Sequence, residues 1–273
     1  MKTQQEKGEA FRTLHERDRA FIIPNPWDAG TARMLAHMGF DALATTSAGN
    51  AFAHAKRDGT VGRECTLANA SAIVGAADVP VSADLENGFG DGPETAAETI
   101  RMAAAAGLVG GSIEDATGRP DAPIYEIDLA IERVQAAAEA AHALPFPFLL
   151  TARAENYLHG REDLKDTIHR LRVYQEAGAD VLYAPGLKTK EDIAAVVRSV
   201  DRPVNVLMGM GDLDLDLDEL SKLGVRRVSV GGALCRLALG TFLGAAREMK
   251  ERGTFGFTKR ATKTAKIIEA LGL

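Results

Sequence analysis

The sequence predicts a single (β/α)8 barrel of the TIM type with an extra helix at its C-terminus. Eight short apolar segments rich in β-branched residues recur along the chain, and helical patterns separate most of them, as is typical of buried parallel strands. The length of 273 residues also suits a barrel, which needs roughly 250 residues. An open doubly wound sheet is the alternative fold, but the first predicted turn, residues 24–28, lacks the glycine-rich sequence that marks such sheets.

The eight predicted strands are apolar runs bounded by turn residues. They span residues 21–23, 42–46, 79–85, 108–113, 146–152, 181–183, 204–208 and 227–230. A helix-terminating glycine comes before every second strand, at Gly39, Gly107, Gly178 and Gly224. A proline introduces three of the others, at Pro80, Pro147 and Pro203. This alternation favours βαβα units that repeat around a closed ring.

Helical periodicity predicts the long helices that connect these strands. They lie at residues 95–106, 128–143, 164–177, 190–199 and 234–252. We therefore assign residues 1–273 to one domain, with an N-terminal helix within 1–19, the barrel over 20–252 and a C-terminal helix over 257–273. The C-terminal helix is expected to be amphipathic, and its apolar stripe would pack on a neighbouring subunit or on its own barrel. The stripe consists of Phe257, Ala261, Ala265 and Ile268.

Composition narrows the class of protein. The chain carries 32 Lys and Arg against 38 Asp and Glu, a net charge of −6 at pH 7, whereas nucleic acids and anionic membranes attract basic surfaces. The two cysteines, Cys65 and Cys235, form neither a disulfide framework nor a zinc-binding spacing. The sequence shows no apolar run of about 18 residues and no signal-like N-terminus. We expect a cytoplasmic protein whose partner is a small molecule.

Polar residues gather where the third, fourth and fifth predicted strands end, on the face of a barrel that carries the active site. Because side chains alternate along a strand, Asp84 and Glu86 should share one face, and Glu114 and Arg153 should join them from the next two strands. Three carboxylates need a compensating charge, and an all-oxygen set favours Mg²⁺. Asn205, in the seventh strand, is expected to bind substrate at the same face. The alternative is structural, with acidic helix caps and a pair between Glu114 and Arg153.

Residues 49–60 form a long polar segment after the second predicted strand. We interpret it as a mobile lid over the substrate, or alternatively as a solvated connection. Asp58 is the lid residue best suited to reach the chemistry. Thr46, Ser47 and Ala48 come just before the lid and offer hydroxyl and backbone N–H groups to a carboxylate or an oxyanion, although a tight turn would look the same.

Four segments together resemble the isocitrate lyase/phosphoenolpyruvate mutase superfamily, in the expected order and over about residues 20–250. They are residues 45–47, 82–90, 112–115 and 151–153. The resemblance implies a β/α barrel with Mg²⁺ or Mn²⁺ at the strand ends. It implies an enzyme that makes or breaks a C–C or P–C bond beside a 2-oxo or 2-hydroxy acid, through an enolate held by the metal. It also implies a homo-oligomer, a dimer or a tetramer, whose subunits exchange the C-terminal helix.

By this resemblance, Asp84 would be the principal metal ligand, and Glu86 and Glu114 would act directly or through bound waters. Glu86 stands where the superfamily more often has the second Asp of an Asp-x-Asp motif, and it still supplies an oxygen ligand. Arg153 would bind substrate charge, as its planar fork suits a carboxylate.

The resemblance also assigns the substrate side of the site. Ser47 and the backbone at Ala48 would hold the substrate carboxylate and the oxyanion, and Asp58 would belong to a gating loop. The isocitrate and methylisocitrate lyases carry a Lys-(Lys/Arg)-Cys-Gly-His loop after the fourth strand, with the Cys as catalytic acid. Here residues 116–121 read Ala-Thr-Gly-Arg-Pro-Asp. The missing Cys argues against those two activities, and the missing Lys argues against the phosphonate enzymes.

These observations predict a Mg²⁺-dependent lyase that cleaves a C–C bond of a small 2-oxo or 2-hydroxy carboxylic acid, for example an oxaloacetate-like acid, without a dedicated acid residue. Two alternatives remain open. One is P–C bond chemistry of the phosphonopyruvate mutase or hydrolase type, with a cation from Lys56 or Arg57 in the lid. The other is a barrel that binds a keto acid without catalysis.

Overall fold

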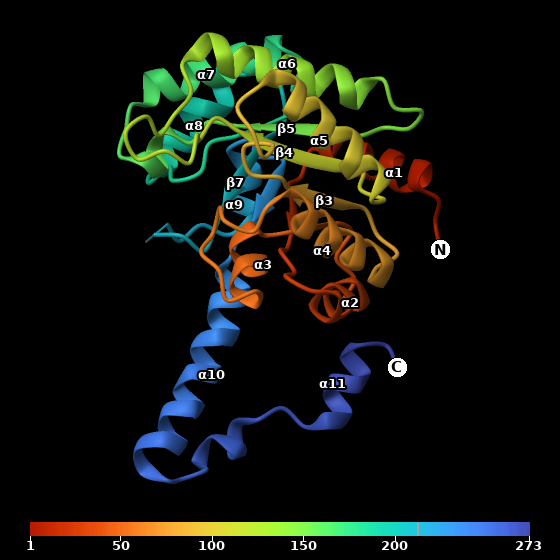
Figure 1. The fold of residues 1–273 in the computed structure, drawn as a ribbon, viewed down its shortest axis with the longest axis vertical. Coiled ribbons are helices and arrows are strands. Elements are labelled where there is room, and N and C mark those ends of the chain that lie inside the picture. Colours follow the sequence, from red (N-terminus) through yellow and green to blue (C-terminus); the bar gives the residue numbers. More distant parts are fainter. Residues whose placement is uncertain (212) are drawn as a thin grey trace.

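The computed structural model describes residues 1–211 and 213–273, and its centre is an eight-stranded parallel sheet rolled into a nearly closed barrel (Figure 1). The strands follow the order β1-β8-β7-β6-β5-β4-β3-β2, and each of the seven ladders is parallel. The remaining junction, between β1 and β2, is crossed by a hydrogen bond from the Ala44 N–H to the Pro24 carbonyl, at 3.1 Å. The predicted fold class is confirmed.

Each strand falls within or beside a predicted apolar segment. The strands are β1 Phe21–Ile23, β2 Leu43–Ala44, β3 Val81–Asp84, β4 Gly110–Glu114, β5 Leu149–Arg153, β6 Val181–Tyr183, β7 Val204–Leu207 and β8 Arg227–Ser229. Most are shorter than predicted, because apolar residues continue beyond the part of each segment that pairs with its neighbours. Strand β5, for example, begins two residues after Pro147, whose missing N–H cannot join a ladder.

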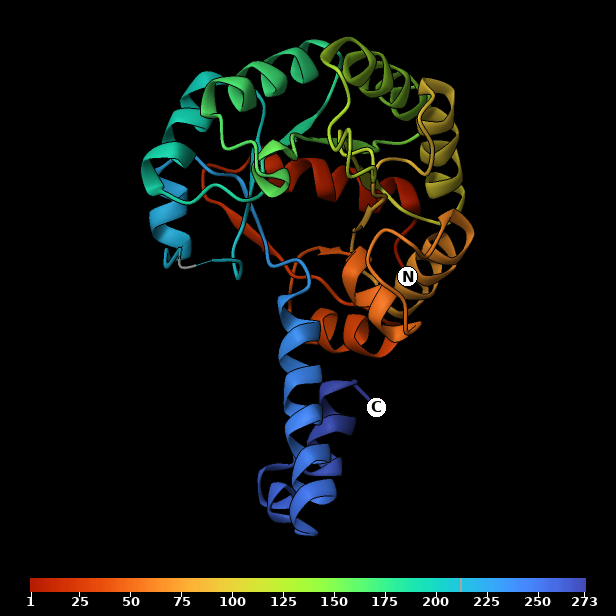
Figure 2. The ribbon, with the colours of Figure 1, turned by 60° about the vertical axis from the view of Figure 1, so that its left-hand side comes forward.

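Helices cover the outside of the barrel, as Figure 2 shows. The α-helices are α1 Gln4–Glu16, α2 Ala29–His37, α3 Ser47–Ala53, α4 Arg63–Ala76, α5 Pro93–Ala105, α6 Ile127–His142, α7 Leu164–Glu176, α8 Lys190–Ser199, α9 Leu217–Lys222, α10 Ala233–Arg252 and α11 Thr264–Ala270. Two 3₁₀ helices span Asn156–His159 and Gly256–Arg260. The five long helices predicted from periodicity are all present, and Pro93 is the first residue of α5, where its missing N–H costs nothing.

Two predicted segments differ from the structure. The first half of the predicted lid is helical, because α3 runs through Ala53 and the Thr46 side chain caps it by accepting from the Gly49 N–H. The predicted C-terminal helix over 257–273 is not one helix. It is divided by extended backbone at Ala261 and Lys263, so the predicted apolar stripe does not lie along a single helix face.

Helix α1 closes the amino end of the barrel (Figure 2). Its Phe11 and Leu14 are 0% and 3% exposed and belong to a core cluster inside the barrel. Gly8 lies against the Pro147 carbonyl at the entrance to β5, too close for a larger residue. This contact limits how closely α1 can pack against the amino end of the barrel. The carboxyl end of the barrel is left uncovered by α1, and this is the end at which such barrels carry their active sites.

Helix α10 runs away from the barrel, and the chain then turns back through α11 (Figures 1 and 2). Cys235 is the buried residue of α10. Apolar side chains farther along are exposed, including Leu237 at 70%, Phe242 at 66% and Phe255 at 63%. Within the described residues, none of the helices has the length and apolar character needed to cross a membrane.

Candidate active site

A cavity of about 290 Å³ opens at the carboxyl ends of the strands. It is small for a ligand pocket, which favours a small metabolite. The predicted substrate residues and one predicted metal ligand line it together: Thr46, Ser47, Ala48, Asp58, Asp84, Arg153 and Asn205. Residues from strands far apart in the sequence therefore meet in one hollow at the expected face of the barrel.

Arg153 is the centre of this site. Its guanidinium forms ion pairs with Asp84 Oδ1 at 2.9 Å, with Glu114 Oε2 at 3.1 Å and with Glu155 Oε1 at 2.8 Å. The register of the sheet causes this, because Glu114 on β4 lies directly beside Arg153 on β5. The Arg153 side chain is only 12% exposed, so these pairs are shielded from water and the guanidinium holds acidic groups together that would otherwise repel one another.

Asp84, at the end of β3, is held by hydrogen bonds on both carboxylate oxygens. Oδ1 accepts from Arg153, and Oδ2 accepts from the Ser47 N–H at 3.2 Å. The Asp84 N–H in turn donates to Thr45 Oγ1 at 3.0 Å. These bonds tie the end of β3 to the start of α3, so one face of the carboxylate is fixed and its 20% exposed part faces the cavity.

The Glu86 side chain lies near Asp84, but strand alternation, which predicted this position, does not explain it. Strand β3 ends at Asp84, and Glu86 has a left-handed backbone, with φ of +51°, so strand alternation does not place its side chain. Its N–H donates to Asp84 Oδ1 at 3.3 Å. Its Oε1 is buried and has no hydrogen-bond partner among the described residues. Burial, together with the charges of Asp84 and Asp58, raises the pKa of Glu86 to about 7.

The Glu114 side chain is 18% exposed, close to the 20% of Asp84. Burial raises its pKa well above the usual range, while the charge of Arg153 opposes that shift. Its Oε2 contacts Arg153, so the structural alternative considered for this residue, a pair with Arg153, is present. Asp58 lies exposed at the rim of the cavity.

Below the carboxylates, the interior of the barrel is polar where most barrels are filled with branched apolar residues. Asn205 Nδ2 donates to Ser229 Oγ at 2.9 Å, and Asn205 Oδ1 accepts from Arg227 Nε at 2.9 Å. Arg227 Nη2 also donates to Thr151 Oγ1 at 3.0 Å. Sequence reasoning did not single out Arg227, although it begins the eighth predicted strand and a charged residue in a buried strand is itself a signal.

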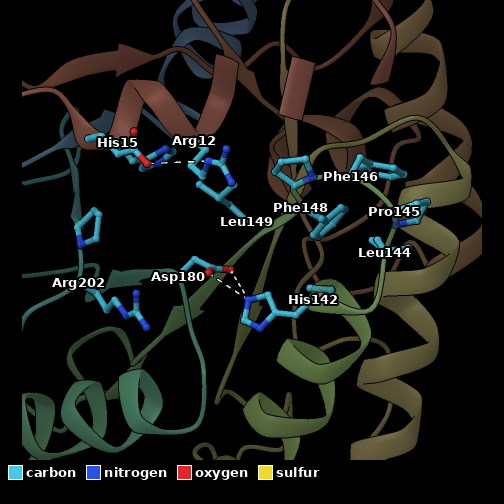
Figure 3. Close-up of a pocket in the computed structure, with 14 residues that line it drawn as sticks. Arg12, His15, His142, Leu144, Pro145, Phe146, Phe148, Leu149, Asp180 and Arg202 are labelled. Atoms are coloured by element: carbon cyan, nitrogen blue, oxygen red, sulfur yellow. Dashed lines mark hydrogen bonds and ion pairs between the residues drawn. The ribbon is translucent and has the colours of Figure 1, made fainter. Parts of the chain in front are cut away.

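A larger hollow, of about 580 Å³, lies at the opposite end of the barrel (Figure 3). It is lined by residues of α1 and of the segments that lead into β5, β6 and β7, including His15, Asp180 and Arg202. One of the interactions drawn in Figure 3 pairs His142 with Asp180, at 3.1 Å. Active sites of such barrels lie at the carboxyl ends of the strands, so the smaller cavity is the candidate active site.

Comparison with known proteins agrees with this geometry. The model of the phosphoenolpyruvate phosphomutase family matches residues 11–250. The chain belongs to this family. The resemblance inferred from the sequence is thereby confirmed. The order of the four matching segments along the chain follows the order of the strands around the barrel.

Three relatives show how far the similarity extends. A crystal structure of a Burkholderia cenocepacia J2315 protein is 61% identical, superposes with a TM-score of 0.96, and covers 99% of this chain and 97% of its own. A protein of Mycobacterium tuberculosis is 30% identical over 246 residues, 89% of each chain. Oxaloacetate decarboxylase of Pseudomonas aeruginosa is 26% identical over 264 residues, which are 94% of this chain and 89% of that enzyme. Carbon–carbon lyases are therefore among the chain's relatives in the family.

The family implies a divalent cation, and the acidic residues fit one only in part. No three His, Cys, Asp or Glu residues in the described chain surround a point at which they could hold a metal ion. Asp84 nonetheless presents a carboxylate to the cavity, and Glu86 Oε1 is buried without a partner, which is the kind of atom a cation or its bound water satisfies. Mg²⁺ commonly takes one or two carboxylates and completes its shell with water, so this donor set suits it.

Proposed function

We propose that the protein is a Mg²⁺-dependent lyase that cleaves a C–C bond of a small 2-oxo or 2-hydroxy carboxylic acid. The observation that carries the proposal is the group of Asp84, Glu114 and Arg153 at the carboxyl ends of neighbouring strands, beside a cavity of about 290 Å³. Family membership and the similarity to oxaloacetate decarboxylase support it. An oxaloacetate-like acid is the substrate we favour.

In this proposal, Asp84 and Glu86 hold the cation, with Glu114 acting through bound water. Mg²⁺ or Mn²⁺ there would supply a positive charge that stabilises the oxyanion produced when the bond breaks. Asp84 is already oriented by the Ser47 N–H and by Arg153, so it needs little rearrangement to bind. Glu86 contributes the oxygen that has no partner in the described protein.

The substrate carboxylate would lie near Thr46, Ser47 and the backbone at Ala48, which line the cavity beside Asp84. Arg153 would donate to the substrate with part of its fork while it keeps its carboxylate neighbours in place. Asp58, which is exposed and lines the cavity, would cover the bound substrate and exclude water.

The segment that replaces the Cys-containing loop favours a reaction without a dedicated protein acid. Residues 116–121 contribute nothing to the lining of the cavity in the described structure. The segment is folded on itself, since Ala116 bridges Ile124 and Thr117 donates to the Ala122 carbonyl. Decarboxylation needs only a water to return a proton to the enolate, whereas retro-aldol cleavage also needs a base that takes the proton of the substrate hydroxyl. Lys56 and Arg57 are exposed and are not among the described residues that line the cavity, which disfavours phosphonate chemistry.

The proposal is tested by incubating the purified protein and Mg²⁺ with a panel of 2-oxo and 2-hydroxy acids, including oxaloacetate and phosphonopyruvate, and following pyruvate and phosphate. We expect pyruvate from an oxaloacetate-like acid and none above background from Asp84→Ala. Phosphate release from phosphonopyruvate would instead support the P–C alternative. Tight binding by calorimetry without turnover of any acid would support a binding protein.

We also propose that the protein is a homo-oligomer whose subunits exchange their C-terminal segments. The exposed apolar residues of α10, including Leu237 and Phe242, are poorly suited to water, and α10 and α11 project from the barrel (Figure 2). A second copy supplies a matching apolar surface. Deleting residues 257–273 should lower the molar mass measured by light scattering to that of a smaller species. An unchanged oligomer would contradict the exchange.

A further inference from the structure

A cysteine and a histidine lie in contact beside the predicted lid. Cys65 Sγ lies 3.4 Å from His54 Nε2, which is within the range of a hydrogen bond to sulfur. Cys65 is half-buried and His54 is exposed, so the contact can be reached from water. Neither residue lines the active-site cavity in the described structure. The pair is therefore separate from the groups proposed for the lyase chemistry.

The proton positions in this pair follow from a second contact of His54. Its Nδ1 lies 2.9 Å from the Asn50 carbonyl oxygen, which can only accept a hydrogen bond, so Nδ1 carries the proton. The neutral imidazole then has a lone pair on Nε2, and the Cys65 thiol donates to it. A nucleophile, a base and a third group that orients the base form the arrangement by which proteins activate a thiol.

The backbone around Cys65 also suits attack by sulfur. Cys65 is the third residue of α4, and the N-cap residue Gly62 makes no side-chain cap hydrogen bond. The first N–H groups of a helix have no partner within it, so they stabilise an anion that develops nearby. Glu64, on the same turn, has a side chain that is 82% exposed, and water and salt therefore screen its charge.

The second cysteine is a contrast within the same protein. Cys235 is 1% exposed, and burial raises the pKa of its thiol. Because the thiolate is the reactive form of cysteine, Cys235 should be inert toward reagents in water while the protein is folded. Cys65 is the thiol that a reagent can reach and that has a base beside it.

The same contact ties the end of α3 to the first turn of α4. These helices lie side by side (Figure 1), and His54 is the C-cap residue of α3. Asn50 of α3 and Thr66 of α4 are 2% and 4% exposed, and their side-chain polar atoms have no hydrogen-bond partner among the described residues. These two side chains add no hydrogen bond to the junction, so the contact between Cys65 and His54 matters more for it.

We propose that Cys65 is a modification site, which forms a mixed disulfide with a low-molecular-weight disulfide such as glutathione disulfide. The Cys65 sulfur attacks one sulfur of the reagent while His54 Nε2 takes the thiol proton. The S–S bond of the reagent breaks as the new S–S bond forms, and the released thiolate takes the proton from the imidazolium. One disulfide is exchanged for another, so the step consumes no further oxidant or reductant.

The mixed disulfide removes the hydrogen bond to His54, because the Cys65 sulfur no longer carries a proton. The lid loop, residues 54–62 between α3 and α4, then loses this link to α4. Asp58 lies in the loop and lines the active-site cavity, so the modification should loosen the cover of the cavity and lower turnover. This effect on turnover rests on the proposed function, whereas the modification itself does not.

The modification is tested by incubating the folded protein with glutathione disulfide at neutral pH and measuring the intact mass. We expect a single glutathione adduct on the wild type and on Cys235→Ser, and no adduct on Cys65→Ser. Cys65→Ser keeps a donor for His54 and should melt like the wild type, which shows that it is folded. An adduct on Cys235, or none under conditions that modify free cysteine, would overturn the proposal.

The role of His54 is measured by the rate of reaction with a chromogenic aromatic disulfide. His54→Asn keeps a donor for the Asn50 carbonyl but removes the base, so Cys65 should react roughly tenfold or more slowly than in the wild type. In urea, where the fold is lost, the two proteins should react equally. A histidine that merely shields the thiol would give the opposite result, a faster reaction in His54→Asn, and that result or equal rates in the folded proteins would refute the base.

Trypsin reports on the lid loop directly, because Lys56 and Arg57 are exposed there. In the glutathione adduct, cleavage after these residues should be roughly fivefold faster, as expected when a hydrogen bond that holds a loop is lost, and a reductant should reverse the change. Unchanged cleavage would remove the link to the lid. An adduct on a protein that turns over no acid retains the site and removes the lyase. Turnover by a protein that forms no adduct retains the lyase and removes the site.

Discussion

Replacing Arg153 by Met is expected to destabilise the protein because it releases three carboxylates from their common cation. The Arg153 side chain is 12% exposed, and its partners Asp84, Glu114 and Glu155 lie at 2.9, 3.1 and 2.8 Å. Removing one partner of a buried pair costs about 3–5 kcal/mol. At roughly 2–4 °C per kcal/mol for a chain of this size, the melting temperature should fall by about 10 °C.

The control is Arg119→Met, which removes an exposed pair with Asp91 at 2.8 Å. Exposed pairs contribute about 0–1 kcal/mol, so this variant should melt close to the wild type. Both variants are followed by calorimetric melting with and without Mg²⁺. Because a cation can bind the released carboxylates, Mg²⁺ should raise the melting temperature of Arg153→Met more than that of the control. A melting temperature of Arg153→Met equal to that of Arg119→Met would refute the electrostatic account of this site.

Two further predictions concern the amino end of the barrel. His15 has a folded-state pKa of about 3, below its ordinary value of 6.5, so protons favour the unfolded chain as the pH falls through 6.5. The titration of His15 alone should lower the free energy of unfolding by about 2 kcal/mol between pH 7 and pH 5. Urea titrations of His15→Asn should show a weaker dependence of that free energy on pH than those of the wild type. The same pH dependence in both proteins would contradict the lowered pKa of His15. Gly8→Ala should destabilise the protein, because the added methyl group would collide with the Pro147 carbonyl. Gly75→Ala is the control, because the space around Gly75 is open, and it should raise the free energy of unfolding by about 0.5–1 kcal/mol. Equal effects of the two glycine substitutions in urea unfolding would show that α1 is not seated as described.

Much of the fold was predictable because local signals agree with the tertiary structure. Apolar runs bounded by Gly and Pro mark the strands, and the helices between them have clear periodicity. The end of the chain was less predictable. Its predicted single helix is divided, and the Thr258 hydroxyl donates to the Phe255 carbonyl at 2.8 Å, a local bond of the kind that competes with continued helix.

The candidate site was predictable where side chains lie on strands. Alternation and strand order bring Asp84, Glu114 and Arg153 together in the structure as the sequence predicted. The same reasoning fails at Glu86, because the strand has ended and the backbone is left-handed there. Arg227 could not be interpreted from the sequence, since its neighbours Asn205 and Thr151 lie 22 and 76 residues away and only the closed barrel brings them near.

The proposed metal site at Asp84 is the central claim, and its most direct test is the rate of acid cleavage as a function of Mg²⁺ concentration. Asp84→Asn is compared with Asp41→Asn, a control that changes an exposed carboxylate paired with Arg17 outside the cavity. We expect the cleavage rate to saturate with Mg²⁺ in the wild type and in Asp41→Asn, and to be roughly 100-fold lower in Asp84→Asn. Cleavage that proceeds equally without Mg²⁺, or equally in the two variants, would contradict it.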